Sequence, residues 1–443
     1  MDANRGKYAI SDNYSTIIYV VDHGAISVVP SHVSCTSSSP LPDARMAPQG
    51  GGRWGSSAHV DAADAGQRLA PREPADVAAT EKLLDRIASI ESTLASQADE
   101  TENIRTLAPA SVAALSDMGL FAALAPREVG GHQVDPIGEM ELIEAIARID
   151  ASTAWSFMIG AGNAARIASI APPAALADMF EQGCPFPRVA YQVLSGGNKA
   201  TSVDGGFRLR GGTWKFATGI RHADWVVAPV VVGSDLEVAC ALDANEVTVL
   251  DDWNPSGLIG TGTFSFRIED AFVPAHRAWA HPGAQVRGGP YFLFKRAPIK
   301  HIGFALGVAD GSLRGLSRVL ALRLSPDGGT SHMICADLGR ASVELEAARS
   351  LSRTVIADVW GEARAAGAVS DHSQKRLRAA AVVATEVALR VTRLVVTRGG
   401  ASTLGRNHPL QRSLRDMSAA AAHAEVRLDA YADFGESLFR VGV

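Results

Sequence analysis

The chain has 443 residues, of which 47% are hydrophobic and 20% are charged, so it can bury several packed layers in two or three structural units. A formal net charge of -5 gives no electrostatic reason to expect a nucleic-acid or anionic-membrane partner. No apolar run reaches the roughly 18 residues of a transmembrane helix. The four cysteines lack the CxxC spacing of metal sites and the density of a disulfide scaffold, which favours a reduced, cytoplasmic setting without a metal centre.

Residues 1–75 differ in composition from the rest of the chain. Ser-rich and Gly-rich patches such as SCTSSSP and APQGGGRWGSS predict that most of this segment is disordered. Its run STIIYVV is β-prone but stands alone, and it lacks the basic start and long apolar core of a secretory signal. An alternative interpretation is an over-extended start upstream of Met46.

Periodicity divides the remaining chain into three regions. Residues 76–187 have apolar residues at helical spacing, as in LLDRIASIESTLA, and predict an N-terminal helical domain. Residues 188–290 contain short β-branched or aromatic runs, such as WVVAPVVV, between turn residues, and predict a β domain. Residues 291–443 return to helical spacing in long, Ala-rich stretches that usually pack against one another. Periodicity alone supports only an α+β protein with segregated elements.

Four motifs carry a family resemblance. GGTWKFATGIRHADW at residues 211–225 resembles the flavin-facing strand and turn of the acyl-CoA dehydrogenase fold. RGGASTLGRNHPLQRSLRDMSAAAAH at residues 398–423 resembles the C-terminal helices of the two-component flavin monooxygenase branch (group D) of that superfamily. GLIGTGTFSFRIEDAFVPAHR at 257–277 and PREVGGHQVDP at 126–136 resemble further family segments. The resemblance covers residues 76–431 and implies an N-terminal helical domain, a middle β-barrel domain and a C-terminal four-helix bundle.

The resemblance also implies an activity. The chain is similar to the oxygenase components of 4-hydroxyphenylacetate, secosteroid-phenol and dibenzothiophene monooxygenases, which use O2 and reduced FMN or FAD made by a separate NAD(P)H-dependent flavin reductase. A C4a-hydroperoxide of the flavin would oxidise a small aromatic, amine or sulfur compound in a dry cavity of a homotetramer. Two alternatives stay open: an acyl-CoA dehydrogenase-like oxidoreductase, and a flavin-less binding or assembly protein.

One position separates the dehydrogenase from the monooxygenase interpretation. The base of the dehydrogenases lies shortly after an Arg-Asp pair, and counting from Asp416 places Ala424 there. Glu425 is one residue later, which rotates it by about 100° on a helix. In the monooxygenase branch the resemblance assigns proton handling to His423, whose imidazole titrates near neutral pH. Asp416, seven residues earlier, would lie on nearly the same face of a continuous helix and could orient His423.

The remaining site residues follow from the motif matches. Thr218, the third predicted catalytic residue, would donate a hydrogen bond toward flavin N5 or the peroxide. Trp214 is expected near the flavin ring, whereas a second strand-end aromatic, Trp225, is expected to be packing. The predicted flavin-binding residues are Trp155, Trp214, Phe216, Thr218, Gly219, His332, Gly399 and Gly400.

Three of these matches rest on different parts of the family pattern. Gly399 and Gly400 match a turn that passes close to the flavin, where a side chain would block approach. Trp155 matches a helix that presents an aromatic ring to the flavin or substrate. His332 occupies the place where relatives often carry a Gln that reaches a neighbouring subunit's flavin.

The chain also departs from the aromatic hydroxylases that it resembles. Ile259, Ser418 and Asn163 stand where those enzymes often have an Arg or His. Because deprotonation of a phenol is assisted by such residues, their absence favours amines, thioethers or natural-product intermediates as substrates. No P-loop, GxGxxG, HExxH or GxSxG motif offers another catalytic class.

Overall fold

The computed structural model describes residues 72–180, 186–192, 196–321 and 332–441, and the backbone of three strands near the N-terminus. The chain splits into two compact units, Met1–Ala65 and Gly66–Val443. In the first unit, β1 (Gly6–Asp12), β2 (Ser15–Asp22) and β3 (Ala25–Val29) form an antiparallel sheet in that order. The β-prone run STIIYVV lies in β2 and pairs with both neighbours. The rest of the segment predicted to be disordered, up to residue 71, lies outside the described residues.

The second unit begins with helices. They are α1 (Pro74–Ser96), α2 (Ala98–Asn103), α3 (Pro109–Asp117), α4 (Pro136–Ile149), α5 (Ala151–Ile170) and α6 (Pro173–Phe180). Local sequence sets the starts of α4 and α5, because the side chains of Asp135 and Asp150 accept hydrogen bonds from the backbone N–H of Gly138 and Thr153. Helix α5 is buried along most of its length, and it carries Trp155.

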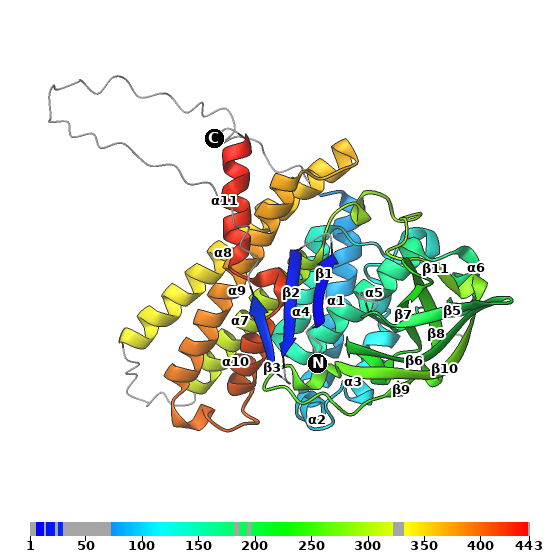
Figure 1. Ribbon diagram of the computed structural model, residues 1–443. Helices are drawn as coiled ribbons and strands as arrows, with labels where there is room; N and C mark the ends of the chain where they lie inside the picture. Colours follow the sequence, from blue (N-terminus) through cyan, green and yellow to red (C-terminus); the bar gives the residue numbers. More distant parts are fainter. Residues whose placement is uncertain are drawn as a thin grey trace, which may run out of the picture. The chain divides into compact units, whose positions relative to one another are not determined.

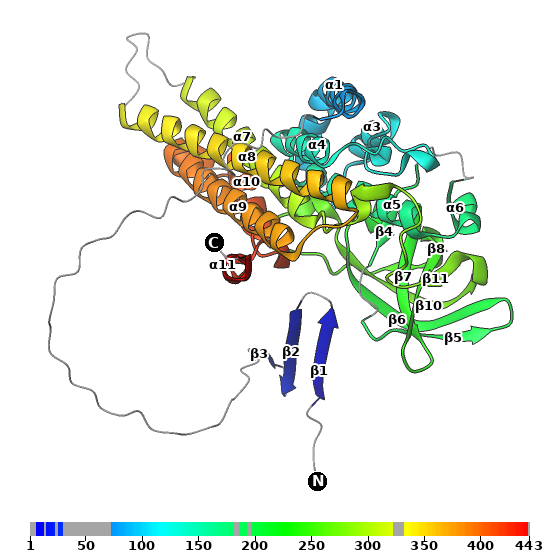
Figure 2. The same ribbon diagram turned by 90° about the horizontal axis from the view of Figure 1, so that it is seen from above.

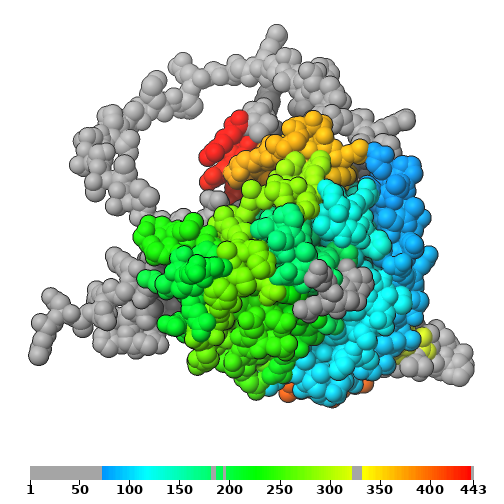
Figure 3. All heavy atoms as spheres, turned by 90° about the vertical axis from the view of Figure 1, so that its right-hand side faces the viewer, coloured from blue at the N-terminus to red at the C-terminus, as the bar shows by residue number. Residues whose placement is uncertain are grey.

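An eight-stranded sheet follows these helices along the chain. Figure 1 draws most of its strands in green, and in the space-filling view of Figure 3 the green part of the chain lies against the cyan part that holds N-terminal helices. Its strands are β4 (Val189–Tyr191), β5 (Lys199–Val203), β6 (Gly206–Ala217), β7 (Trp225–Val232), β8 (Leu236–Asp243), β9 (Thr248–Val249), β10 (Phe264–Pro274) and β11 (Ala278–Ala280). The hydrogen-bonded order is β11-β8-β7-β5-β6-β10-β9, and β4 pairs with β7. The short helical turn η6 (Ile259–Thr261) precedes β10.

The described part of the chain ends in five helices, of which α7 to α10 lie side by side (Figure 2). They are α7 (Ala297–Ala321), α8 (His332–Ala366), α9 (Asp371–Gly399), α10 (Pro409–Ala420) and α11 (Asp429–Val441). The predicted order of a helical region, a sheet and a second helical region is therefore confirmed. Among the helices in the described part of the chain, none combines the length and apolar character needed to span a bilayer.

Glycines let α7 pack closely on α4. Gly303, Gly307 and Gly311 recur every four residues and therefore share one face of α7. An added Cβ on these residues would lie 2.5, 2.4 and 2.4 Å from backbone carbonyl oxygens of α4. The close approach holds the N-terminal and C-terminal helices together and fixes the rotation of α7.

Gly307→Ala is therefore expected to destabilise the protein by about 1–3 kcal/mol, because its methyl group would displace the α4 backbone. Gly361→Ala on α8 is the matched control, since nothing lies within 4 Å of its added Cβ. This control is expected to stabilise the helix by up to about 1 kcal/mol. Urea denaturation followed by circular dichroism measures both, and equal effects from the two variants would contradict the close-packing argument.

Candidate active site

The η6 loop connects three parts of the fold. The backbone N–H of Leu258 donates to Oδ1 of Asp416 on α10 over 2.6 Å. The carbonyl of Thr261 accepts from the N–H of Gly219, in the turn after β6, at 3.2 Å. The same carbonyl accepts from the hydroxyl of Ser156 on α5 at 3.5 Å. The turn after β6, helix α5 and helix α10 therefore meet at this loop.

Four rings from three elements cluster beside this junction. The ring of Trp155 lies edge-on to those of His301 and Phe304 on α7, with centroid distances of 5.5 and 5.3 Å. It is also edge-on to His423 at 5.9 Å, and the two imidazoles lie 4.4 Å apart. Burial and the neighbouring His423 lower the pKa of His301 well below its ordinary value, so this ring is neutral near pH 7.

The backbone fixes which nitrogen of His423 carries its proton. His423 precedes the turn η10 (Ala424–Val426), and its Nδ1 accepts the backbone N–H of Glu425 at 3.3 Å. A neutral imidazole whose Nδ1 is an acceptor carries its hydrogen on Nε2. Although much of His423 is exposed in the single chain, surrounding protein desolvates the ring and lowers its pKa. His423 thus offers an Nε2–H donor at the edge of the ring cluster.

Asp416 does not take the predicted place beside His423. Helix α10 ends at Ala420, so the continuous helix that would stack Asp416 under His423 does not exist. Asp416 is buried and binds the amide of Leu258 instead. Its other oxygen has no hydrogen-bond partner among the described residues. The carboxyl holds the η6 loop against α10, and its predicted role of orienting His423 is corrected to a structural one.

Burial raises the pKa of Asp416 to about 7, opposed by the Leu258 hydrogen bond. A carboxyl with a raised folded pKa contributes stability below its unfolded pKa of 3.8 and loses it as pH rises toward 7. Asp416→Asn keeps an acceptor for Leu258 and never ionises. The stability of Asp416→Asn relative to the wild type should therefore rise between pH 4 and 7, by up to about 3 kcal/mol. Above pH 7 the difference should stay constant. Urea midpoints at pH 4, 5.5 and 8 measure this, and a constant difference would contradict it.

The predicted flavin-facing turn contains two residues with positive φ angles. Phe216 has φ of +64° and its side chain is 69% exposed, and Gly219 has φ of +77°. Between them, the hydroxyl of Thr218 forms a 2.9 Å hydrogen bond with the hydroxyl of Thr263. Thr218 and Gly219 therefore lie at the junction formed by the η6 loop.

Trp214 is not at the surface of this turn, and its predicted place near the flavin ring is corrected. The side chain is 2% exposed and stacks on Phe266 with centroids 5.2 Å apart. Its indole N–H donates to the carbonyl of Pro229 at 3.0 Å. With a ring face stacked on Phe266 and its donor occupied, Trp214 is a core residue of the sheet. Trp225, predicted to be packing, is also buried.

The other predicted cofactor residues lie at the ends of the long C-terminal helices. Gly399 ends α9, and Gly400 adopts φ of +68° and ψ of -163°, a conformation that is essentially restricted to glycine. His332 is the exposed first residue of α8. None of the three belongs to the ring cluster within the described residues.

His301, a member of the ring cluster, and its neighbour Lys300 were not identified from the sequence. The Nζ atom of Lys300 lies 2.0 Å from the point that a Cβ on Gly162 of α5 would occupy. Desolvation lowers the pKa of Lys300 to about 8. The negative charge of Glu139 opposes this shift, but the Glu139 carboxylate accepts its hydrogen bonds from Tyr291 and Arg296. Lys300 is a half-buried residue beside α5 whose amine has a poorly compensated charge. Only the helical spacing of residues 300, 301 and 304 hinted at a shared location.

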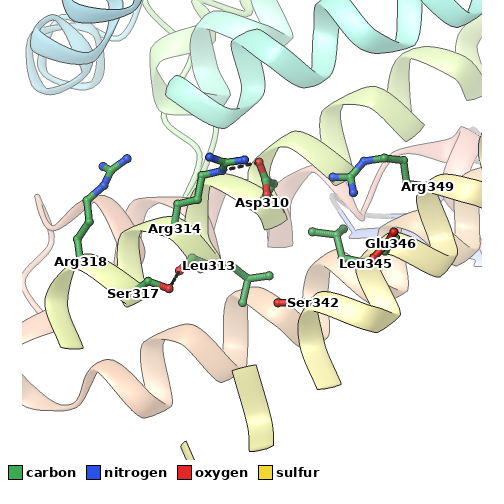
Figure 4. Close-up of a pocket in the computed structure, with 9 residues that line it drawn as sticks. All are labelled: Asp310, Leu313, Arg314, Ser317, Arg318, Ser342, Leu345, Glu346 and Arg349. Carbon is green, nitrogen blue, oxygen red and sulfur yellow. Dashed lines mark hydrogen bonds and ion pairs between the residues drawn. The ribbon is translucent and has the colours of Figure 1, made fainter. Parts of the chain in front are cut away.

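A separate surface pocket lies between α7 and α8 (Figure 4). Its volume is about 510 Å³, and Arg314 in it pairs with Asp310 at 2.9 Å. Arg349 at its edge pairs with Glu144. None of the predicted site residues lines this pocket, and its charges largely compensate one another, so it is not the candidate active site.

Comparison with known families agrees with this geometry. Residues 80–174 match the model for the acyl-CoA dehydrogenase N-terminal domain, and residues 300–427 match the model for its C-terminal domain. The chain belongs to the acyl-CoA dehydrogenase superfamily. The two matched segments carry Trp155 on one side and Lys300, His301 and His423 on the other.

Within this superfamily, the similar proteins are oxygenases. The oxygenase subunit HsaA, a flavin-dependent monooxygenase from Rhodococcus jostii (strain RHA1), is 29% identical over 77% of this chain and 94% of its own length. The oxygenase component of an FADH2-dependent resorcinol hydroxylase from Rhizobium sp. (strain MTP-10005) is 27% identical, with coverage of 81% and 94%. The structure of XiaF from Streptomyces sp. in complex with FADH2 and glycerol has a TM-score of 0.72, with 23% identity and coverage of 82% and 96%, and shows the shared fold. The predicted assignment to the flavin-dependent monooxygenase branch is confirmed.

The polar groups of this superfamily member fit a reduced flavin. A reduced isoalloxazine ring has an N5–H donor and carbonyl acceptors on one edge, and flat apolar faces. The Thr218 hydroxyl oxygen at the η6 loop provides an acceptor, and the Nε2–H of His423 in the ring cluster provides a donor. Trp155 provides an aromatic wall that is only 8% exposed.

Proposed function

We propose that this protein is the oxygenase component of a two-component monooxygenase that uses O2 and reduced FMN or FAD to oxidise a small organic molecule. The convergence of the Thr218 turn, helix α5 and helix α10 on the η6 loop, together with the contact of His423 with Trp155 of α5, carries the proposal. When bound, the reduced flavin supplies the electrons that activate oxygen. Thr218, Gly219 and Phe216 would hold its polar edge, and Gly399, Gly400 and His332 would contact its phosphate-bearing portion, including that of a neighbouring subunit.

The residues of the chain then control protons and water. The Nε2–H of His423 donates a hydrogen bond to the reacting oxygen and keeps that proton available, since Nδ1 is held by the backbone. Trp155 and His301 are buried beside it and exclude water from one side. Exclusion of water strengthens the hydrogen bond from His423 and limits unproductive release of reduced oxygen.

Lys300 narrows the substrate class. Its amine lies against Gly162, next to Asn163, the residue that replaces a histidine of the aromatic hydroxylases. A half-buried, desolvated amine without an ion-pair partner in the described residues repels amine substrates and favours an acidic oxygen, either a phenol or a carboxylate. We propose that Lys300 supplies the positive charge that the motif comparison found missing. Substrates with an acidic oxygen are thus favoured over amines and thioethers.

An anaerobic titration tests the function. The purified protein is mixed with reduced FMN or reduced FAD, binding is measured, and 18O2 is admitted with a panel of phenols, aromatic acids, sulfides and amines. Incorporation of one 18O atom into an acidic aromatic compound is the expected result. Reduction of bound oxidised flavin by an acyl thioester would instead indicate a dehydrogenase that uses Glu425. Failure to bind either flavin would favour the flavin-less binding protein.

Assembly and partners extend the proposal. We expect a homotetramer, because apolar side chains such as Met333, Val343 and Phe439 are exposed on the C-terminal helices. Light scattering coupled to gel filtration should give the mass of four chains. A separate NAD(P)H-dependent reductase would supply reduced flavin in the cytoplasm. We also propose domain bounds of 76–187, 188–290 and 291–443, which follow the order of helices and strands. Limited proteolysis tests these bounds.

A further inference from the structure

Three threonine hydroxyls form a chain of hydrogen bonds that ends at Thr218. The hydroxyl of Thr261 donates to the carbonyl of Leu258 at 2.9 Å. The hydroxyls of Thr261 and Thr263 are 2.8 Å apart, and those of Thr263 and Thr218 are 2.9 Å apart. Thr261 is fully buried, Thr263 is 8% exposed, and Thr218 is half-buried. The chain thus runs from the protein interior to the predicted flavin site.

The carbonyl at the buried end fixes the direction of every bond. A carbonyl oxygen can only accept, so the single hydroxyl hydrogen of Thr261 is used on Leu258. Thr263 must therefore donate to Thr261, and its own hydrogen is used in turn. Thr218 must then donate to Thr263. Its hydrogen points inward, and only lone pairs of its oxygen face outward.

This direction reverses the predicted role of Thr218. A hydroxyl whose hydrogen is used inside the protein cannot donate to flavin N5. It can accept from N5–H, which the reduced flavin has and the oxidised flavin lacks. Turning the Thr218 hydrogen outward would leave the Thr263 oxygen without its donor in a nearly dry environment, which is unfavourable.

We propose that Thr261 and Thr263 are positioning residues that hold Thr218 as a hydrogen-bond acceptor and so make the site select reduced over oxidised flavin. The inference rests on the proposed function, because it requires that a flavin binds at Thr218. This selectivity suits an oxygenase that receives its flavin by diffusion. An acceptor at this position admits the reduced form and releases the oxidised form after each reaction.

Thr263→Val tests the proposal, because valine has nearly the shape of threonine but no hydroxyl. Without Thr263, the Thr218 hydroxyl can rotate and donate outward to the bare N5 of oxidised flavin. The ratio of the dissociation constants of oxidised and reduced flavin should fall about tenfold, as expected for one hydrogen bond. Equilibrium titrations with oxidised FMN, and anaerobically with reduced FMN, measure the ratio; FAD replaces FMN if the wild type prefers it.

Two further variants make the test specific. Thr263→Ser restores the hydroxyl and should restore the wild-type ratio. Thr261→Val leaves Thr263 free to donate to Thr218, so it should lower the ratio as Thr263→Val does. With reduced flavin labelled by 15N at N5, the resonance of N5 should shift in the valine variants but not in the serine variant.

The outcomes separate this inference from the function. If Thr263→Val weakens both redox forms equally, or if Thr263→Ser matches Thr263→Val, the threonine chain is only structural and the inference is overturned. If the wild type oxidises substrate yet binds both flavin forms equally, the inference again fails while the function stands. If the wild type binds neither form, the function fails and this inference fails with it.

Discussion

Replacing His423 by alanine is expected to lower the rate of substrate oxidation by about 10²- to 10⁴-fold, the range for loss of a positioned proton donor. The reduced flavin should still bind, because the Thr218 turn is separate from the turn that carries His423. Oxygen should still be consumed, but more of it should be released as hydrogen peroxide. The fold should survive, since His423 is at the protein surface and its Nδ1 caps only a three-residue turn.

Product formed per oxygen consumed, together with peroxide yield, measures this effect at saturating reduced flavin. His276→Ala is the matched control, because His276 is exposed and pairs with Asp178 far from the ring cluster. Desolvation of the ring by the surrounding protein lowers the pKa of His423, so its neutral form persists below the ordinary titration range of histidine. Wild-type product yield should therefore fall only at a pH below that range. Unchanged yield in His423→Ala would remove His423 from the mechanism.

The motif matches identified the segments that form the candidate site, but they could not establish which side chains face it. Thr218 and Gly219 lie in a turn whose shape depends on consecutive residues, so a contiguous motif describes them well. Trp214 and Phe216 differ by two positions and would share one face of a regular strand. Instead, residue pairing shifts between Phe264 and Phe266, and Phe216 has a positive φ. This β-bulge directs Trp214 into the core and Phe216 outward.

The prediction for Asp416 failed for a different reason. The sequence MSAAAAH has no Gly or Pro to stop a helix, so local propensity favours a helix that continues through His423. The helix ends at Ala420 because tertiary contacts override propensity: Val426 is buried and the turn before it is capped by His423. The partner of Asp416, the amide of Leu258, lies 158 residues away along the chain. Sequence spacing alone cannot identify such a contact.

The overall fold could be predicted more fully than the site, because helical and strand periodicities are local properties. The rotation of each helix is not local. Lys300 and His301 are adjacent on α7, and the side chains that they meet depend on how Gly303 and Gly307 seat that helix on α4. The position of the Lys300 amine beside Gly162 therefore could not be predicted from the sequence and required the structure.

Lys300→Met should make the protein more stable and a poorer enzyme. The folded pKa of Lys300 is about 8 and its unfolded value is 10.5, so burial disfavours its charged form. A lysine with a depressed folded pKa costs stability at pH 7, and this cost disappears as pH rises from 8 to 10.5. Methionine fills the same space without charge. It should stabilise the protein at pH 7 by about 2 kcal/mol, and this gain should vanish near pH 10.5.

The same substitution should weaken binding of acidic ligands. Loss of one charge-assisted hydrogen bond corresponds to about a 10- to 100-fold higher Kd. 4-Nitrophenol, which ionises near neutral pH, reports this directly through the absorbance of its phenolate, and benzoate competes with it if carboxylates bind as well. Lys82→Met, at an exposed site on α1, should alter neither stability nor binding. A lysine that only balanced the charge of Glu139 would behave in the opposite way: its loss would destabilise the protein and leave phenolate binding unchanged. Greater stability with weaker binding is the combination that identifies a desolvated charge kept for its substrate.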